Sequence, residues 1–259
     1  MTLRRVMELR ILGSGTSTGV PEIGCNCPVC TSDDPRDNRR RASALIHADD
    51  GSTILIDCGP DFREQMLQAK WFGKIDGVLI SHIHYDHVGG LDDLRPFCRW
   101  GEVSVYAEEY TAEHLRTYMP YCFAEHKYPG VPKIALQEIK AGTPFFINHT
   151  EVLPLRVMHG KLPILGYRIG RRMAYITDML TMPEESYAQL EGLDILVMNA
   201  LRVEPHMSHQ SIAEALRAAG RIGAKETYFI HMSHHAGLHA EIEAKLPPHV
   251  HFAYDGLML

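Results

Sequence analysis

The sequence predicts a layered α/β domain with mixed sheets, and three observations support this fold class. Short apolar runs rich in β-branched residues recur along the whole chain. Between several of these runs lie segments whose apolar residues recur every three or four positions, as in an amphipathic helix. The runs come in groups of two or three before each helical segment, whereas a purely parallel sheet would alternate single strands with single helices.

The expected strands are the β-branched runs, at residues 9–12, 44–47, 53–57, 77–81, 103–106, 151–158, 165–169, 174–177, 195–199, 227–231 and 251–254. The expected helices are the periodic segments, at residues 61–71, 109–118, 184–190, 208–219 and 239–245. Ser208 is the expected N-cap of the fourth helix. Glycine and proline make residues 125–132 an expected irregular loop, either a plain connection or a rim over the active site.

Composition is that of an ordinary globular protein, with 45% hydrophobic and 22% charged residues in 259. The net charge of −6 argues against a nucleic-acid partner, which usually requires a basic face. No apolar run is long enough to cross a membrane. Glu8 and Arg10 interrupt the apolar stretch that a secretory signal would need, so we expect a cytoplasmic protein. No low-complexity linker divides the chain, and we expect one domain over residues 1–259.

Four side chains able to bind metal follow the expected strand 77–81 at once: His82, His84, Asp86 and His87. Imidazole and carboxylate ligands without thiolate suit zinc, manganese or iron. Four ligands so close in sequence cannot all reach one ion comfortably. We therefore expect two ions, with His82 and His84 on one and Asp86 and His87 on the other. A chance polar turn is the alternative, and the ordered spacing of the cluster argues against it.

The pattern His82-x-His84-x-Asp86-His87 resembles the motif of the metallo-β-lactamase superfamily, and the resemblance extends over nearly the whole chain. It implies a four-layer αββα sandwich with the metals at one edge. The other motif residues of the superfamily match Asp57, His159, Asp178 and His231, each at the end of an expected strand.

The resemblance also implies a role for each of these residues. It assigns the first metal to His82, His84 and His159. It assigns the second metal to Asp86, His87 and His231. Asp178 would bridge the two ions, and Asp57 would orient one of the ligands.

Three cysteines lie within six residues, at Cys25, Cys27 and Cys30. In a chain without a secretion signal, clustered cysteines more often bind metal than form disulfides. A tetrahedral zinc site needs a fourth ligand, and His234 is the candidate, with His235 as the neighbouring alternative. This combination resembles the PhnP branch of the superfamily, the phosphoribosyl cyclic phosphodiesterases. The resemblance implies a structural zinc ion on a small loop near residues 24–31.

Three further stretches complete the expectations. The glycine-rich residues 13–21 resemble the N-terminal loop of the branch, although a turn packed near the metals would look the same. The remaining cysteines, Cys58, Cys98 and Cys122, are expected to be buried and reduced. In the resembling family a histidine near the fourth helix protonates the leaving group. His209 matches it, His206 is the reserve, and a capping or surface histidine is the alternative.

The expected function is hydrolysis of small cyclic or nucleotide-like phosphodiesters. A hydroxide bridging two manganese or zinc ions would attack phosphorus, with Asp86 orienting it and His209 acting as general acid. The alternatives are a tRNA-processing type of nuclease, a thioester hydrolase and a non-catalytic zinc scaffold. The expected partner is a small phosphodiester, without membrane or nucleic acid, and the resemblance suggests a homodimer.

Overall fold

The structure is a computed structural model that describes residues 7–124, 126 and 128–259. The first ten residues and the expected loop 125–132 therefore lie partly outside the described residues. The first sheet contains β1 (Glu8–Gly13), β2 (Ser43–His47), β3 (Thr53–Ile56), β4 (Gly77–Leu79), β5 (Val103–Glu108) and β6 (Ile134–Ile139). The second contains β7 (Phe145–Ile147), β8 (Thr150–His159), β9 (Leu162–Ile169), β10 (Met173–Ile176), β11 (Ile195–Asn199), β12 (Glu226–Ile230) and β13 (Val250–Phe252).

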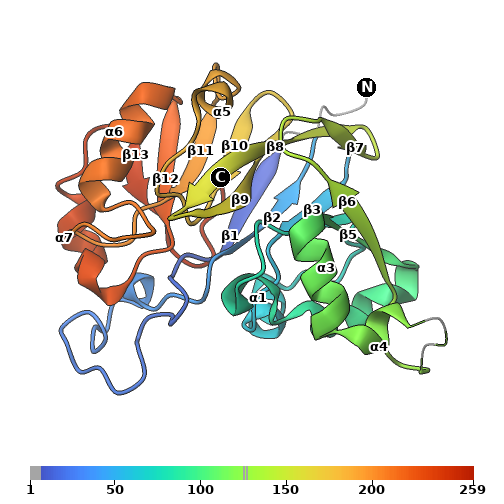
Figure 1. Cartoon of the computed structure of the whole chain (residues 1–259). Helices are drawn as coiled ribbons and strands as arrows, with labels where there is room; N and C mark the ends of the chain where they lie inside the picture. Colours follow the sequence, from blue (N-terminus) through green and yellow to red (C-terminus); the bar gives the residue numbers. More distant parts are fainter. Residues whose placement is uncertain (1–6, 125, 127) are drawn as a thin grey trace, which may run out of the picture.

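Helices cover the two outer faces of this pair of sheets (Figure 1). The α-helices are α1 (Phe62–Ala69), α2 (Tyr85–Val88), α3 (Glu109–Tyr118), α4 (Pro120–Phe123), α5 (Glu184–Ala188), α6 (Ile212–Ile222) and α7 (His239–Glu243). The 3₁₀-helices are η1 (Pro35–Asp37), η2 (Leu91–Trp100) and η3 (His234–Ala236). Among the described residues, no helix is both long and apolar enough to span a bilayer.

Both sheets are mixed, as the sequence predicts. In the first sheet β1, β2 and β3 pair antiparallel, and β3 to β6 pair parallel. In the second sheet β7 to β10 pair antiparallel, and β10 to β13 pair parallel. Each sheet thus combines hairpin-type strands with strands that need helical crossovers, which is why the apolar runs come in groups.

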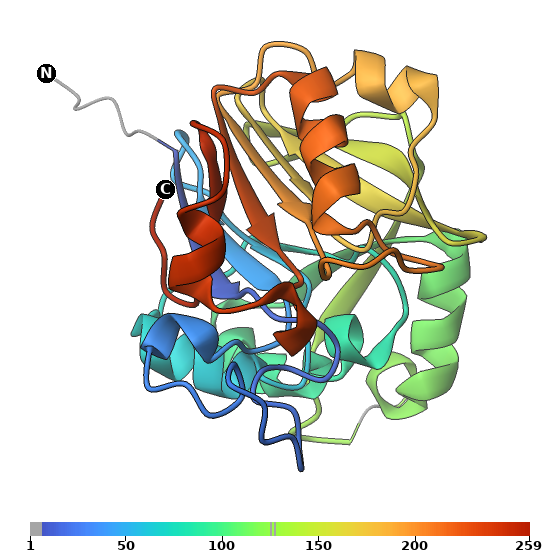
Figure 2. The same cartoon turned by 90° about the vertical axis from the view of Figure 1, so that its left-hand side faces the viewer.

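Three apolar clusters show that the molecule has four layers. Along β3, Ile54 and Ile56 join the cluster between the sheets, whereas Leu55 joins the cluster under α1 and α3. This follows from the period of two in a strand that is buried on both faces. A third cluster lies between the second sheet and α6, which crosses its outer face (Figure 2). The αββα sandwich expected from the resemblance is confirmed.

The last residues of the sequence cover the free edge of β1. Leu9 and Leu259 exchange two backbone hydrogen bonds of 3.0 and 2.8 Å. The amide of Ile11 also donates to the carbonyl of Leu257, and its carbonyl accepts from the amide of Gly256. This pairing protects an edge strand that would otherwise expose unpaired backbone groups.

Several local predictions were wrong. The fourth helix begins after Ser211 rather than Ser208, because Ser211 and Glu214 form a reciprocal capping box. Strands β6 and β7 and helix α2 were not predicted. The helices η2 and α4 were not predicted either.

Candidate metal centre

The motif residues lie where strands end, and parallel pairing brings those ends together. Ile56 pairs with Leu79, so Asp57 and the segment from Ser81 to His87 leave the first sheet at the same edge. In the second sheet, Asp178 and His231 follow β10 and β12, the two neighbours of β11.

The backbone at three of these positions is left-handed. Asp57, Asp178 and His231 have φ of 57°, 56° and 58°. This conformation costs a non-glycine residue about 1–2 kcal/mol, although aspartate and histidine adopt it more readily than most. Strain that recurs at three strand ends of one site marks residues placed for function rather than for packing.

The first group of candidate ligands is His82, His84 and His159. One ring nitrogen from each lies within 4.8 Å of the others. His82 Nε2 is 2.9 Å from His84 Nδ1, and two backbone carbonyls, of Asp178 and Ser208, lie 3.1 and 3.0 Å from His159 Nδ1. Because a carbonyl can only accept, His159 Nδ1 carries the proton, which leaves Nε2 as its ligand atom.

The second group is Asp86, His87 and His231, again within 4.8 Å of one another. Asp178 lies between them. Its carboxylate is 3.2 Å from His87 Nε2 and 3.3 Å from His231 Nε2. It also forms a separate group with His82 and His87, so its two oxygens face both sets of ligands.

Asp57 orients His87 from behind. Its Oδ2 lies 2.7 Å from His87 Nδ1, and the carboxylate accepts two further bonds of 2.8 Å from the backbone amide and hydroxyl of Ser81. All three residues are buried. Protonation of Nδ1 toward Asp57 leaves the Nε2 lone pair of His87 aimed at Asp86 and Asp178.

The electrostatics of the centre favour bound cations. Burial acts to lower the pKa of His87, but the carboxylates of Asp86, Asp57 and Asp178 outweigh it and raise that pKa well above its usual value. Burial similarly acts to raise the pKa of Asp178, and the charges of His231 and His87 overcome it and lower the pKa. Clustered carboxylates around imidazoles make a site for positive charge.

Unpaired nitrogens give an independent test of whether metals fit. Four buried imidazole nitrogens have no hydrogen-bond partner among the described residues: His87 Nε2, His209 Nδ1 and both ring nitrogens of His231. Buried polar atoms are nearly always paired in native proteins. Three of the four belong to residues in the second ligand group, so the donor set fits divalent cations.

His209 lies against the same centre. Its Nδ1 is 3.5 Å from Asp178 Oδ1, and its ring packs 4.5 Å from His159 and 4.9 Å from His231. Burial, followed by the charge of His231, lowers its pKa to about 3. His206 is the outer neighbour at 5.2 Å, and its Nδ1 lies beside the amide and hydroxyl of Ser208. Of the two histidines, His209 therefore lies nearer to the candidate metal ligands.

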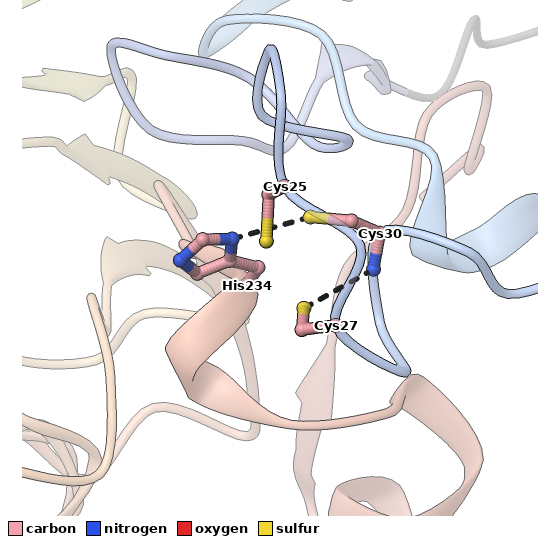
Figure 3. Close-up of side chains that lie close together, drawn as sticks. All are labelled: Cys25, Cys27, Cys30 and His234. Atoms are coloured by element: carbon pink, nitrogen blue, oxygen red, sulfur yellow. Dashed lines mark hydrogen bonds between the residues drawn. The ribbon is translucent and has the colours of Figure 1, made fainter.

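A third group of candidate ligands lies between the long N-terminal loop and η3. The three sulfurs of Cys25, Cys27 and Cys30 and a ring nitrogen of His234 lie within 4.8 Å of one another, and all four side chains point toward a common centre (Figure 3). His234 Nδ1 is 3.2 Å from Cys30 Sγ. His235 lies outside the group and contacts His234 through Nε2 at 2.8 Å. Three thiols and one imidazole are a donor set that suits tetrahedral zinc.

A buried arginine anchors that loop to the rest of the protein. The Arg39 guanidinium donates to Ser14 Oγ at 2.9 Å and to the Ala253 carbonyl at 2.6 Å. Ser14 in turn donates through its amide and hydroxyl to Asp255 Oδ1, and its carbonyl accepts from the amide of Met232, the residue after His231. The glycine-rich stretch 13–21 is thus fixed beside the strand end that carries His231.

Sequence reasoning missed the supporting residues. Ser81 contacts Asp57, His82 and His87, yet a serine before a histidine motif looks like any strand-end residue. Asn199 holds the loop after Asp178, accepting from the Met179 amide and donating to its carbonyl. Neither residue type is distinctive in sequence.

Comparisons with known proteins now place the chain. A family model described as "Beta-lactamase superfamily domain" matches residues 52–232. A crystal structure of "a New Diphosphatase from the PhnP Family" has a TM-score of 0.90 and 40% identity, covering 98% of this chain and 96% of that one. The chain belongs to the β-lactamase superfamily and, within it, to the PhnP family. The family resemblance read from the motifs is confirmed, and the fold is that of the metal-dependent hydrolases of this superfamily.

Two other relatives of this PhnP-family member carry different names. An octanoyltransferase of Porphyromonas gingivalis is 50% identical over 252 residues, which are 97% of this chain but 51% of that protein. The chain therefore spans about half the length of this curated relative. Zinc-bound PqqB from Methylobacterium extorquens has a TM-score of 0.79 at 21% identity, covering 97% of this chain and 99% of that one, and shows the shared fold alone.

Proposed function

We propose that this PhnP-family hydrolase is a phosphodiesterase that acts on small cyclic or nucleotide-like phosphodiesters with two divalent cations, zinc or manganese. One observation carries the proposal. The two groups His82–His84–His159 and Asp86–His87–His231 adjoin each other, and the Asp178 carboxylate lies between them. The PhnP-family relative at 40% identity is named a diphosphatase, which favours phosphoryl chemistry.

The ligand roles follow from position. His82, His84 and His159 would hold one cation, Asp86, His87 and His231 the other, and Asp178 would contact both. Bound in this way, divalent cations lower the pKa of water and neutralise charge on phosphoryl oxygens. Asp57 keeps the His87 proton on Nδ1 and so keeps Nε2 available. Asp86, beside His87 and His231, is also placed to orient an attacking water.

Hydrolysis forms one P–O bond to the water oxygen and breaks one P–O ester bond, so the departing alkoxide must gain a proton. His209 is the proposed donor, because its ring adjoins His159 and His231. It groups with His159 and Asp178 but belongs to neither of the two proposed ligand triads. An unprotonated imidazole cannot donate as an acid. The anionic substrate would have to raise the pKa of His209 on binding, since opposite charge favours the protonated form.

We further propose that Cys25, Cys27, Cys30 and His234 bind one structural zinc ion. Zinc there would join the N-terminal loop to η3 and contribute directly to folding. Three cations per chain are therefore expected, whereas a non-catalytic zinc scaffold would hold one. The proposed enzyme needs no nucleic-acid partner, and we expect a homodimer, which light scattering would test.

A second candidate function comes from the octanoyltransferase relative. Its name favours acyl chemistry, and a thioester hydrolase is the form of it that a cation-binding site would support. Because the chain matches only half of that relative, the name can describe the other half.

The deciding experiment measures metal content and then turnover by the reconstituted protein. Three substrates separate the candidates: a ribose cyclic phosphate, a nucleoside diphosphate and an octanoyl thioester. Turnover of the cyclic phosphate that disappears on chelation and returns with manganese or zinc is expected. Turnover of the thioester alone would refute the phosphodiesterase proposal.

A further inference from the structure

A cavity lies beside the loops that carry Asp178 and His209. Its volume is about 310 Å³, and it is lined by residues other than the proposed metal ligands. The loop Leu180–Met182 forms one wall, and Gln210, the residue after His209, forms another. Helices α5 and α6, both on the outer face of the seven-stranded sheet, supply the rest (Figure 1).

Gln210, which lines this cavity, has an unpaired acceptor oxygen. Gln210 is only 5% exposed. Its Nε2 donates to the Leu180 carbonyl at 3.3 Å, but its Oε1 is buried without a hydrogen-bond partner among the described residues. Unpaired buried carbonyl oxygens are uncommon and call for a donor. A ligand hydroxyl in the cavity would supply one.

Helix α6 presents two guanidinium groups to the same cavity. Arg217 and Arg221 are four residues apart and therefore lie on one helix face. Arg221 packs over the Tyr187 ring at 3.7 Å and pairs with Glu184. The Arg221 side chain of that ion pair is 46% exposed and the Glu184 side chain 76%, so solvent weakens the pair and a phosphate could compete with Glu184 for the guanidinium. Arginine pairs favour phosphate, whose oxygens match the guanidinium donors.

The cavity wall is bonded to the metal centre. The Gln210 amide donates to the Met179 carbonyl at 2.9 Å, next to Asp178. The Leu180 amide donates to the Met158 carbonyl at 2.8 Å, next to His159. A ligand that contacts Gln210 and the Leu180 loop could therefore shift the positions of His209, Asp178 and His159 through these backbone hydrogen bonds.

We propose that this cavity binds a small phosphomonoester that carries a free hydroxyl, and that its occupancy changes turnover at the metal centre. Arg217 and Arg221 hold the phosphate, and the hydroxyl donates to Gln210 Oε1. This inference rests on the proposed function, because a phosphomonoester with a free hydroxyl is the product that such a phosphodiesterase would release. Hydrolysis of a cyclic phosphodiester turns one ester oxygen into a hydroxyl and leaves a phosphomonoester on the same molecule.

The test is binding of ribose 5-phosphate to the metal-loaded protein, measured by calorimetry without turnover. The wild type is expected to bind at two sites per chain, one at the metal centre and one in the cavity. The R217A/R221A double variant is expected to bind at one. R99A removes another exposed arginine and should keep both sites. Thermal melting confirms that each variant is folded.

Kinetics supply the second arm. A product that competes with substrate at the metal centre raises the apparent KM and leaves kcat unchanged. A change in kcat therefore indicates that ribose 5-phosphate is bound in the cavity. A change in kcat of at least about twofold is expected in the wild type and in R99A, and none in R217A/R221A. One binding site in the wild type, or an unchanged stoichiometry and kcat effect in the double variant, overturns the proposal. Two sites without phosphodiester hydrolysis would instead overturn the proposed function and leave the second site standing.

Discussion

The substitution Asp57→Asn tests how the protein sets the ligand atom of His87. Asparagine tolerates the left-handed backbone at this position, so the change isolates the carboxylate. The carboxylate accepts from three donors: the Ser81 amide, the Ser81 hydroxyl and His87 Nδ1. An amide has a single acceptor oxygen. Whichever way the substituted side chain turns, its NH₂ group must face a donor.

The expected outcome is a change of tautomer at His87. The Ser81 amide is a fixed donor, so the asparagine oxygen should stay there and its NH₂ should face His87 Nδ1. His87 then accepts at Nδ1 and carries its proton on Nε2, the atom aimed at Asp86 and Asp178. Loss of such a supporting contact typically costs about 10- to 100-fold in metal affinity. This corresponds to about 1.4–2.8 kcal/mol.

The assay is competition with a chelator, followed by elemental analysis. The affinity for one active-site cation should decrease by about 10- to 100-fold. The zinc ion proposed at Cys25, Cys27, Cys30 and His234 should stay bound. Asp50→Asn is the control, because the Asp50 carboxylate accepts hydrogen bonds from the backbone amides of Ser52 and His149 but lies outside the centre. Wild-type affinity for all cations in the Asp57 variant would refute the tautomer argument.

Three further predictions concern other residues of the two candidate metal sites and the buried Arg39. Asp178→Ala should lose active-site metal and turnover together, whereas His209→Ala should keep full metal content and lower kcat by about 10²- to 10⁴-fold; full turnover by the latter on a substrate with a poor leaving group would exclude a general acid. Cys30→Ser should lower zinc content by one ion per chain and the melting temperature with it, while His235→Ala should change neither, and elemental analysis with thermal melting distinguishes the two. Arg39→Met should destabilise the fold by about 1–3 kcal/mol, because the buried Ala253 carbonyl and Ser14 hydroxyl lose their charged donor. A loss of free energy of unfolding in urea of less than about 1 kcal/mol would mean that these hydrogen bonds contribute little.

Sequence patterns located most of the fold because the buried strands carry clear runs. Strand β11 and helix α3 match their predicted bounds. Strand β6 was not predicted because it is a partly exposed edge strand, and its central residues Leu136-Gln137-Glu138 are not β-branched. The predicted cap Ser208 lies three residues before the observed one, because the reciprocal capping box of Ser211 and Glu214 is a stronger physical signal than a lone serine.

The candidate metal centre could be predicted from the sequence for a different reason. Its candidate ligands are histidines and aspartates that follow apolar runs, and both features are visible in the sequence. The residues that orient them are not, because Ser81 and Asn199 act through contacts between segments far apart in the chain. The cavity beside Gln210 likewise depends on the tertiary packing of α5 and α6.

The pairing of Leu9 with Leu259 has a consequence for synthesis on the ribosome. The outer edge of β1 can be covered only by residues 256–259, which are translated long after it. His231 and His234 also follow more than two hundred residues after Cys30. Nascent chains that stall early should thus expose an open strand and half-built binding sites, which makes them targets for chaperones and proteases.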